Sequence, residues 1–248
     1  MRHSKRTNIL IPLGGAGKRF SDVGYTKPKP FIDVNGESMI KRVIMNLYHV
    51  EAHFIFIINE ENTSPQEFSE HIGDLDISYS LYSIPKLTEG PACTSLVAKD
   101  KIDNEDPLII INCDQIISDF KLETLWSFCS VNNCDGLLGC FVSSSEKNSY
   151  VSLDQNGHVQ DVKEKVVISN IATNGLHFWK RGSDFVKYAE EMIEKDIRVN
   201  NEFYVCPVFN QAVNDGKKIR TFDIPKMWGL GTPEDLNYYL ENYKTDRD

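Results

Sequence analysis

The 248-residue sequence has no long hydrophobic run, no closely paired cysteines and no internal repeat. No stretch approaches the roughly 18 consecutive apolar residues of a membrane-spanning helix, and the first residues lack the apolar core of a secretory signal. The six cysteines are scattered without a Cys-x-x-Cys pair, which excludes the common zinc spacings and indicates buried, reduced thiols in a cytoplasmic protein. Because no hexapeptide repeat occurs in this sequence, we expect no appended left-handed β-helix domain.

A net positive charge is also missing, because 27 basic residues stand against 36 acidic ones and give a net charge of −9. This balance argues against non-specific binding to nucleic acid. The hydrophobic content of 41% and the charged content of 25% are ordinary for a globular protein. An acidic chain that handles an anionic substrate must gather its cations locally, and the first thirty residues contain such a cluster.

An apolar run at 8–13 leads into the segment 14–19 (Gly-Gly-Ala-Gly-Lys-Arg), and a second basic segment at 27–30 (Lys-Pro-Lys-Pro) follows one loop later. Glycines let backbone N–H groups approach an anion closely, and the basic side chains add charge. Arg19 stands where a Walker A loop requires Ser or Thr. Phe20 stands where the dinucleotide fingerprint requires a small residue. A tight turn that is basic by chance is the alternative, but the two clusters together favour a triphosphate-binding loop.

Strand and helix patterns alternate through the first half of the chain. We predict strands at 8–13, 53–58, 76–83 and 108–112, and helices at 37–50 and 91–101. This order is typical of a parallel sheet covered by helices, with ligands at the carboxyl ends of the strands. After about residue 135 we predict strands at 136–142, 150–153, 158–163, 172–179 and 218–223, and helices at 183–195, at 208–214 and from 233.

A carboxylate follows the most aliphatic of these strands, since Asp114 comes directly after the run 108–113. A carboxylate beside so much buried apolar surface is costly unless it meets a cation or hydrogen-bond donors. Mg²⁺ bound by one or two carboxylates and by substrate phosphates fits this position. The alternative is an aspartate that caps the next element.

Together these motifs resemble the N-terminal signature of the sugar nucleotidyltransferases, which is a buried strand, then Gly-x-Gly-x-Arg, then Pro-Lys-x-Phe or Leu. The resemblance implies a single-domain, glycosyltransferase-A-like (Rossmann-like) α/β fold over 1–248, with a mostly parallel central sheet flanked by helices and a mixed-strand acceptor-binding lobe. The nucleotide-binding half would be 7–134 and the acceptor-binding half 135–248. In this family the arginine and the Pro-Lys lysine contact the nucleotide phosphates and an aspartate at the strand end binds metal, which points to Arg19, Lys29 and Asp114.

The resemblance also implies the remaining site residues. The nucleotide would be bound further by Leu13, Gly14, Gly15, Ala16, Gly17, Lys18, Glu89, Gly90 and Ala92. The segments 162–165 (Val-Lys-Glu-Lys) and 172–178 (Ala-Thr-Asn-Gly-Leu-His-Phe) are similar to the acceptor motifs of the family. They would bind the acceptor through Glu164, Lys165, Asn174 and Gly175, with Glu202 assigned to the same side. A lone Glu-Lys pair is usually a solvated surface feature, so this assignment rests on the order of the motifs along the chain.

The segment 227–235 resembles the closing motif of the family, aromatic-x-Asp-x-Gly-Thr-Pro-Glu-Asp, but departs from it at the aspartate. Gly229 stands where many members have an aspartate that serves as a second metal ligand. Asp223 is our candidate replacement, with Glu202 as a further possibility, and either could equally be structural. We interpret His177 as a core or strand-face histidine, the alternative being that it faces the acceptor.

The implied reaction transfers a nucleotidyl group from an NTP (CTP, dTTP, UTP or GTP) to a small phosphorylated acceptor, with Mg²⁺ as cofactor and pyrophosphate as the second product. A sugar or polyol phosphate used in surface polysaccharide (capsule or lipopolysaccharide) synthesis is the first choice, and phosphocholine and other phosphorylated alcohols or acids stay open. One alternative is a glycosyltransferase of the same fold, although the segment 113–115 is Cys-Asp-Gln and not Asp-x-Asp. Another is a catalytically silent nucleotide-binding homologue that regulates a partner. We expect no nucleic acid or membrane partner, and a homo-oligomer stays open.

Overall fold

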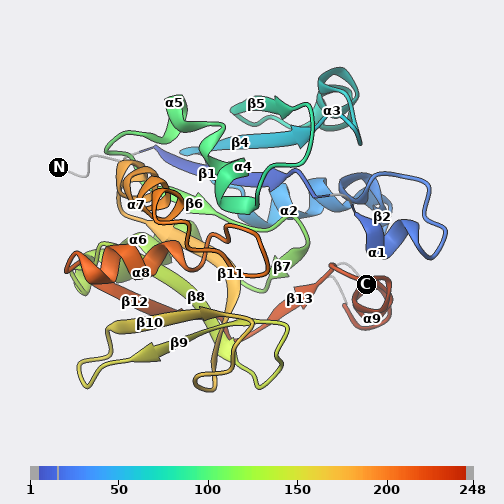
Figure 1. The fold of residues 1–248 in the computed structure, drawn as a ribbon. Helices are drawn as coiled ribbons and strands as arrows, with labels where there is room; N and C mark the ends of the chain where they lie inside the picture. The colour runs from blue at the N-terminus through green and yellow to red at the C-terminus, as the bar shows by residue number, and fades with distance from the viewer. Residues whose placement is uncertain (1–5, 16, 244–248) are drawn as a thin grey trace.

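The structure is a computed structural model that describes residues 6–15 and 17–243. Within this part of the chain, the main sheet has nine strands in the order β10-β9-β11-β6-β1-β4-β5, with β8 paired to β11 and β12 paired to β8 (Figure 1). Two short two-stranded sheets, β2-β3 and β7-β13, lie beside it. The strands are β1 (Thr7–Leu13), β2 (Asp33–Val34), β3 (Glu37–Ser38), β4 (Ala52–Asn59), β5 (Tyr79–Ile84), β6 (Leu108–Ile110), β7 (Gln115–Ile117), β8 (Gly136–Val142), β9 (Ser149–Leu153), β10 (Val159–Glu164), β11 (Ile171–Trp179), β12 (Ile219–Asp223) and β13 (Met227–Gly229).

The first half of the chain forms the parallel part of this sheet. The strand β1 is parallel to both β4 and β6, and β4 is parallel to β5. The strand β11 runs antiparallel to β6, β8 and β9 and so joins the second half of the chain to the first. The predicted α/β class, with a mixed and mostly parallel sheet between helices, is confirmed.

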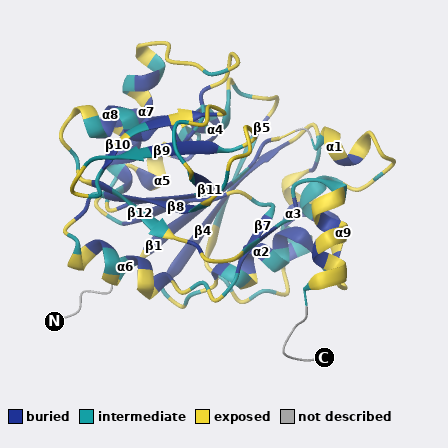
Figure 2. Cartoon of the chain, turned by 90° about the horizontal axis from the view of Figure 1, so that it is seen from below, coloured by how far each residue is buried: buried dark blue, intermediate teal, exposed yellow. Residues whose placement is uncertain are grey.

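Helices cover both faces of the sheet because its central strands are apolar on both faces. In β4, Phe54 and Phe56 pack into one core, whereas Ile55 and Ile57 pack into the other. Figure 2 shows these buried strands between helices whose outer sides are exposed. The helices are α1 (Lys18–Ser21), the 3₁₀ turn η1 (Lys29–Phe31), α2 (Met39–Leu47), α3 (Pro65–Ile72), α4 (Pro91–Leu96), α5 (Lys99–Ile102), α6 (Leu122–Val131), α7 (Gly182–Glu194), α8 (Val208–Asn214) and α9 (Pro233–Asn242).

Several element boundaries differ from the sequence prediction. The helix predicted at 37–50 begins at Met39, because Glu37 and Ser38 pair with β2 across a turn in which Asn35 and Gly36 have φ of 53° and 81°. The strand predicted at 108–112 ends at Ile110, so Asp114 lies in the segment between β6 and β7. The elements α3, α6, β7 and β13 were not predicted.

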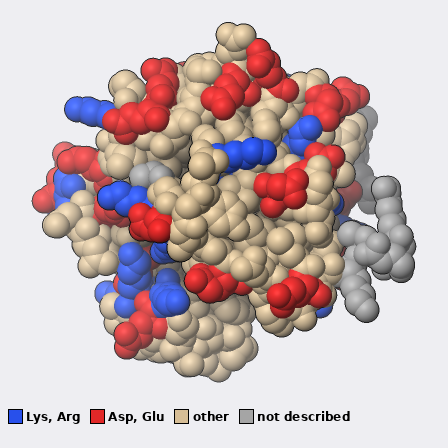
Figure 3. Space-filling view, turned by 90° about the vertical axis from the view of Figure 1, so that its right-hand side faces the viewer, with Lys and Arg blue, Asp and Glu red and all other residues tan. Residues whose placement is uncertain are grey.

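Surface charge, helix length and cysteine state each bear on function. On the face seen in Figure 3, Lys and Arg side chains are interspersed with Asp and Glu side chains, unlike the continuous basic footprint of a nucleic-acid-binding domain. Within the described residues, no helix combines the length and apolar character needed to cross a membrane. All six cysteines are free thiols.

Candidate active site

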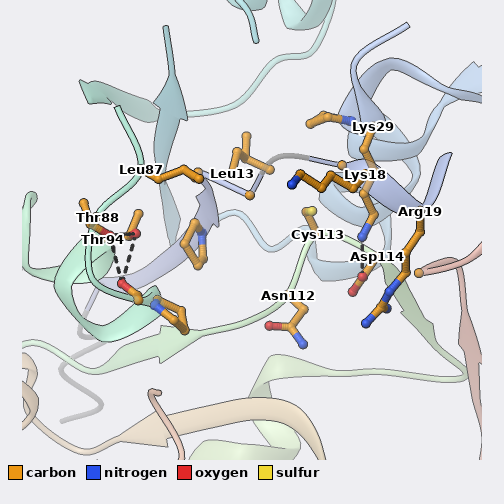
Figure 4. A pocket seen from close by; sticks show the side chains of 18 of the residues that line it. Leu13, Lys18, Arg19, Lys29, Leu87, Thr88, Thr94, Asn112, Cys113 and Asp114 are labelled. Atoms are coloured by element: carbon orange, nitrogen blue, oxygen red, sulfur yellow. Dashed lines mark hydrogen bonds and ion pairs between the residues drawn. The ribbon is translucent and has the colours of Figure 1, made fainter. Parts of the chain in front are cut away.

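A cavity of about 640 Å³, here called the first chamber, opens at the carboxyl end of β1 (Figure 4). The glycine loop forms one wall, the segment 87–94 forms the opposite wall, and the segment 112–114 lies between them. The lining includes most of the residues predicted to bind nucleotide, namely Leu13, Gly14, Gly15, Gly17, Lys18, Arg19, Lys29 and Gly90. Ala16 lies outside the described residues.

Short helical turns position the cations of this chamber. Gly17 has φ of 64° and directly precedes α1, which carries Lys18 and Arg19. Lys29 begins η1, whose last residue, Phe31, is buried with its ring centroid 4.2 Å from that of His71. Three basic side chains therefore line one chamber from two turns that are close in sequence, an arrangement that suits a polyanionic group such as a triphosphate.

An ion pair joins the glycine-loop side to the segment after β6. Lys29 Nζ lies 2.5 Å from Asp114 Oδ2, and the two side chains are only 19% and 24% exposed. Burial lowers the pKa of Lys29, but the carboxylate of Asp114 outweighs this effect, so the net pKa is raised and the ammonium stays charged. Burial raises the pKa of the neighbouring Cys113 thiol to about 11, which keeps it neutral. The charges available to a substrate at this point are therefore those of Lys29 and Asp114.

The opposite wall is built around Gly90, which precedes α4. Its φ of 135° is accessible to glycine alone, and a Cβ there would lie 2.5 Å from Phe203 N. Thr94 Oγ1 lies 2.7 Å from Thr88 Oγ1 and donates to Gly90 O, so both hydroxyls are held in the lining (Figure 4).

Two residues predicted on this wall do not line the chamber. Glu89 pairs with Arg198 at 3.4 Å, and its carbonyl accepts a hydrogen bond from Phe203 N. Ala92 is buried, and its N–H donates to Phe203 O at 2.9 Å. Both residues thus attach the wall to the segment around Phe203.

A second cavity of about 340 Å³, here called the second chamber, adjoins the first. The two chambers share five lining residues, which are Pro12, Pro91, Asn112, Asp114 and Gly231. Asp114 is the one charged residue among these five, so its side chain borders both chambers.

Three residues predicted to bind the acceptor line the second chamber: Glu164, Asn174 and Gly175. Glu164 accepts a hydrogen bond from Ser149, and burial raises the pKa of its carboxyl group. Gly175 has φ of 87°, and a Cβ there would lie 2.5 Å from Asn112 Nδ2. A side chain at this position would therefore collide with one of the shared lining residues.

The other two predicted acceptor residues are placed differently. Lys165 is exposed and donates to the hydroxyl of Tyr204, which does line the second chamber, at 2.7 Å. Glu202 follows a turn in which Asn200 and Asn201 both have positive φ, and it lines the first chamber. The structure thus places Lys165 outside the lining of the second chamber, one side chain away, and Glu202 in the lining of the first chamber.

A carboxylate that was not predicted as a metal ligand, that of Asp235, lies near Asp114. A Cβ on Gly231 would lie 3.0 Å from Asp114 Oδ2 and 4.0 Å from Asp235 Oδ2, and a Cβ on Gly229 would lie 3.6 Å from Asp235 Cγ. Asp235 therefore occupies the space next to the position where the family pattern has an aspartate. Asp223, at the end of β12, lines neither chamber.

Strand pairing brings Asp235 to this position. The strand β13 pairs antiparallel with β7, so that Gly229 faces Gln115, and Leu230 N donates to Asp114 O at 2.7 Å. The Thr232 hydroxyl then accepts from Asp235 N and begins α9. Two carboxylates and the open space between the chambers fit a hard divalent cation, which takes oxygen ligands and keeps sites free for phosphate. Among the described residues, no group of three or more His, Cys, Asp or Glu side chains forms a closed metal site.

Several lining residues of the second chamber were not among the predicted site residues. Gln115, Lys147, His177 and Tyr204 all belong to its lining. His177 is a buried strand residue, 6% exposed, as predicted, and it also lines the second chamber. The sequence signal for His177 was its position as a polar residue between apolar neighbours in its strand.

Comparison with known proteins agrees with this geometry. The family model for nucleotidyl transferases matches residues 9–245. The chain belongs to the nucleotidyl transferase family. This nucleotidyltransferase is 28% identical over 204 residues to the mannose-1-phosphate guanylyltransferase catalytic subunit beta of Dictyostelium discoideum. The match covers 76% of the chain and 54% of that protein, so the chain spans about half the length of this relative.

Solved structures support the fold of the nucleotidyltransferase. A nucleoside-diphosphate-sugar pyrophosphorylase from Vibrio cholerae RC9 superposes with a TM-score of 0.83 at 22% identity, over 94% of this chain and 100% of that one. The inositol-1-phosphate CTP transferase of T. maritima superposes with a TM-score of 0.75 at 17% identity, over 99% of this chain and 100% of that one. At these identities the likeness concerns the fold alone.

Proposed function

We propose that this nucleotidyltransferase transfers an NMP group from an NTP to a sugar phosphate or polyol phosphate and releases pyrophosphate. The nucleotide would bind in the first chamber and the acceptor in the second. The observation that carries this proposal is the meeting of the two chambers at Asp114, beside the cations of the glycine-loop side. The names of the relatives, which act on mannose 1-phosphate and inositol 1-phosphate, are consistent with it.

In this reaction a phosphate oxygen of the acceptor forms a bond to the α-phosphorus of the NTP, while the bond from the α-phosphorus to the bridging oxygen breaks and pyrophosphate leaves. The protein forms no covalent bond, so rate acceleration comes from positioning and from neutralising charge. Arg19 and Lys29 would balance the charge on the triphosphate from the first chamber. Lys165 would reach the acceptor phosphate from the rim of the second chamber.

Asp114 and Asp235 are the residues that we propose to hold Mg²⁺. A Cβ on Gly231, which lines both chambers, would lie within 4.0 Å of both carboxylates. Asp223 lines neither chamber. When bound, the ion would offset negative charge on the phosphates. Lys29 would keep the Asp114 carboxylate oriented toward the junction through their ion pair.

The test is to incubate the protein with each of the four NTPs, Mg²⁺ and a panel of phosphorylated acceptors, and to measure pyrophosphate. We expect release that requires both an NTP and one acceptor. Lys29→Ala and Arg19→Ala should each lower turnover by at least about 100-fold, because each removes a charge aimed at the phosphates, without unfolding the protein. Wild-type turnover by both variants would remove the basis for the proposal.

The same assay separates the alternatives. Consumption of an NDP-sugar without pyrophosphate release would identify a glycosyltransferase, and nucleotide binding without turnover would identify a silent homologue. Production of an activated sugar or polyol would in turn support our wider proposal, a cytoplasmic role in surface polysaccharide synthesis. Deletion of the gene in its source organism, followed by analysis of surface glycans, tests that role directly.

A further inference from the structure

The second chamber gathers three buried side chains that each keep one polar atom without a partner. The side chains of Gln115, Asn174 and His177 are 4%, 4% and 6% exposed. Gln115 Nε2, Asn174 Nδ2 and His177 Nε2 have no hydrogen-bond partner among the described residues. Buried polar atoms are almost always paired in folded proteins, so three unpaired atoms in one cavity need partners from outside the chain, which a bound ligand can supply. The other unpaired buried atoms among the described residues belong to side chains that line neither chamber.

The hydrogen-bonding role of His177 is fixed by its surroundings. Its Nδ1 lies 3.3 Å from Ile110 O, and a carbonyl oxygen can only accept, so Nδ1 carries the hydrogen. Burial lowers the pKa of His177 to about 4, which leaves the ring neutral near pH 7. The Nε2 atom is therefore a hydrogen-bond acceptor. Its ring is held against Phe209, with the ring centroids 6.1 Å apart and the planes at 29°.

The two amides complement this acceptor. Asn174 Oδ1 accepts from Leu176 N at 3.1 Å, which fixes the orientation of the amide and leaves its nitrogen as a donor. The nitrogen of Gln115 is a second donor. A hydroxyl group can both donate and accept, so a molecule with several hydroxyls satisfies all three atoms, whereas an alkylammonium or a carboxylate does not.

The charges around the second chamber bear on acceptors that carry further negative charge. Its lining contains three carboxylates, those of Asp114, Glu164 and Asp235, against one lysine, Lys147. The body of a bound acceptor, beyond its phosphate, would be repelled by these carboxylates if it carried further negative charge. An uncharged, hydroxyl-bearing body fits both the charges and the unpaired atoms.

We propose that His177 is a specificity-determining residue that accepts a hydrogen bond from a hydroxyl of the acceptor, and thereby selects phosphorylated sugars or polyols over phosphorylated amines and acids. This inference rests on the proposed function, because it assigns the second chamber to the acceptor. It adds to that function a hydrogen bond, accepted by the buried His177, that determines which acceptors bind.

Two substitutions separate the polar atoms of His177. The shorter amide of His177→Asn can still donate toward Ile110 O but has no acceptor at the Nε2 position. The longer amide of His177→Gln can place an oxygen there. His53→Asn is the matched control, because His53 is also buried, has its pKa lowered to about 4 chiefly by burial, and lines neither chamber.

The kinetic experiment measures KM and kcat separately for glucose 1-phosphate, mannose 1-phosphate, inositol 1-phosphate, phosphocholine and phosphoserine. We expect turnover with at least one of the three hydroxylated phosphates and none with the last two. For that acceptor His177→Asn should raise KM roughly tenfold with a smaller change in kcat, since one hydrogen bond to an uncharged substrate is lost. His177→Gln should recover most of the affinity, and His53→Asn should match the wild type.

A binding experiment keeps this inference separate from the proposed function. In protein labelled with ¹⁵N-histidine, addition of the three hydroxylated phosphates without NTP should shift the His177 Nε2 resonance with at least one of them, and leave His53 unchanged. If no acceptor yields pyrophosphate, the proposed function fails, and this titration still decides the role of His177. An unmoved Nε2 resonance, or an unchanged KM in His177→Asn alongside normal wild-type turnover, would overturn the inference.

Discussion

The substitution Gly90→Ala tests how the first chamber is built. Gly90 has φ of 135°, and a Cβ there would lie 2.5 Å from Phe203 N and 2.6 Å from Phe203 O. Both atoms belong to hydrogen bonds that join the two segments, from Phe203 N to Glu89 O at 2.8 Å and from Ala92 N to Phe203 O at 2.9 Å. An alanine would have to strain its own backbone and push this connection apart.

The expected cost follows from these contacts. The glycine-only backbone conformation costs an alanine about 1–3 kcal/mol. Weakening two backbone hydrogen bonds adds about 0.5–1.5 kcal/mol each, so the free energy of unfolding should fall by about 2–6 kcal/mol. For a chain of this length that corresponds to a decrease in Tm of roughly 5–20 °C. Since Gly90 lines the first chamber, NTP affinity should fall as well.

Substitutions of two other glycines separate the cost of backbone strain from the cost of steric contact. Gly24 has φ of 93° but nothing within 4 Å of a Cβ, so Gly24→Ala should show backbone strain alone, about 1–2 kcal/mol. Gly15 has nothing within 4 Å either and no positive φ, so the free energy of unfolding of Gly15→Ala should stay within about 0.5 kcal/mol of the wild type. The assays are urea denaturation and calorimetric titration with NTP. If Gly90→Ala were as stable as Gly24→Ala, the contact between Gly90 and Phe203 would not be what fixes this wall.

Two further predictions concern metal binding and pH. Asp235→Asn should weaken Mn²⁺ or Mg²⁺ binding in calorimetry about 10-fold or more, whereas Glu234→Gln, in the same exposed first turn of α9, should leave binding unchanged. Adding Gly229→Asp to the Asp235→Asn variant should restore the affinity for the metal. Equal affinity of all these proteins would exclude Asp235 as a ligand. His53 and His177 both have their pKa values lowered to about 4 in the folded protein, so the unfolded chain binds more protons between about pH 6.5 and pH 4, and the free energy of unfolding should decrease as pH falls through that range. A double substitution of both histidines should flatten this slope in urea denaturation measured at several pH values, and an unchanged slope would contradict the assignment.

The sequence predicted the elements whose hydrophobic pattern is strong and local. The helix at 208–214 has the predicted bounds, and β1, β4, β8 and β11 differ from prediction by one residue at an end or not at all. The helix α3 was missed although Ser64 and Pro65 give it a normal start signal. The helix α6 was missed because apolar residues occur on its outer side too, as at Val131, which is 84% exposed, and this blurs the helical period.

The sequence likewise predicted some residues of the candidate site and missed others. Gly90 and Gly175 were predicted as ligand-binding residues, and the structure gives each a positive φ and a neighbouring segment in contact range. The strand end at Asp114 was correct to within a few residues, but the approach of Asp235 was not foreseen. A helix-start motif such as the segment 232–235 has a complete local explanation, so no local signal pointed to a second role for Asp235.

The amino-acid sequence by itself predicted a phosphate-binding loop, because the glycine loop and its cations are close together in the chain and their chemistry needs no distant partner. It also determined the α/β class, through hydrophobic runs that must be covered on both faces. Only the tertiary structure decided which carboxylates, amides and histidine meet across the junction of the two chambers. The pairing of β13 with β7 brings Asp235 beside Asp114, and the pairing of β11 with β6 turns His177 toward the second chamber. Such meetings depend on strand order and register, which no local pattern specifies.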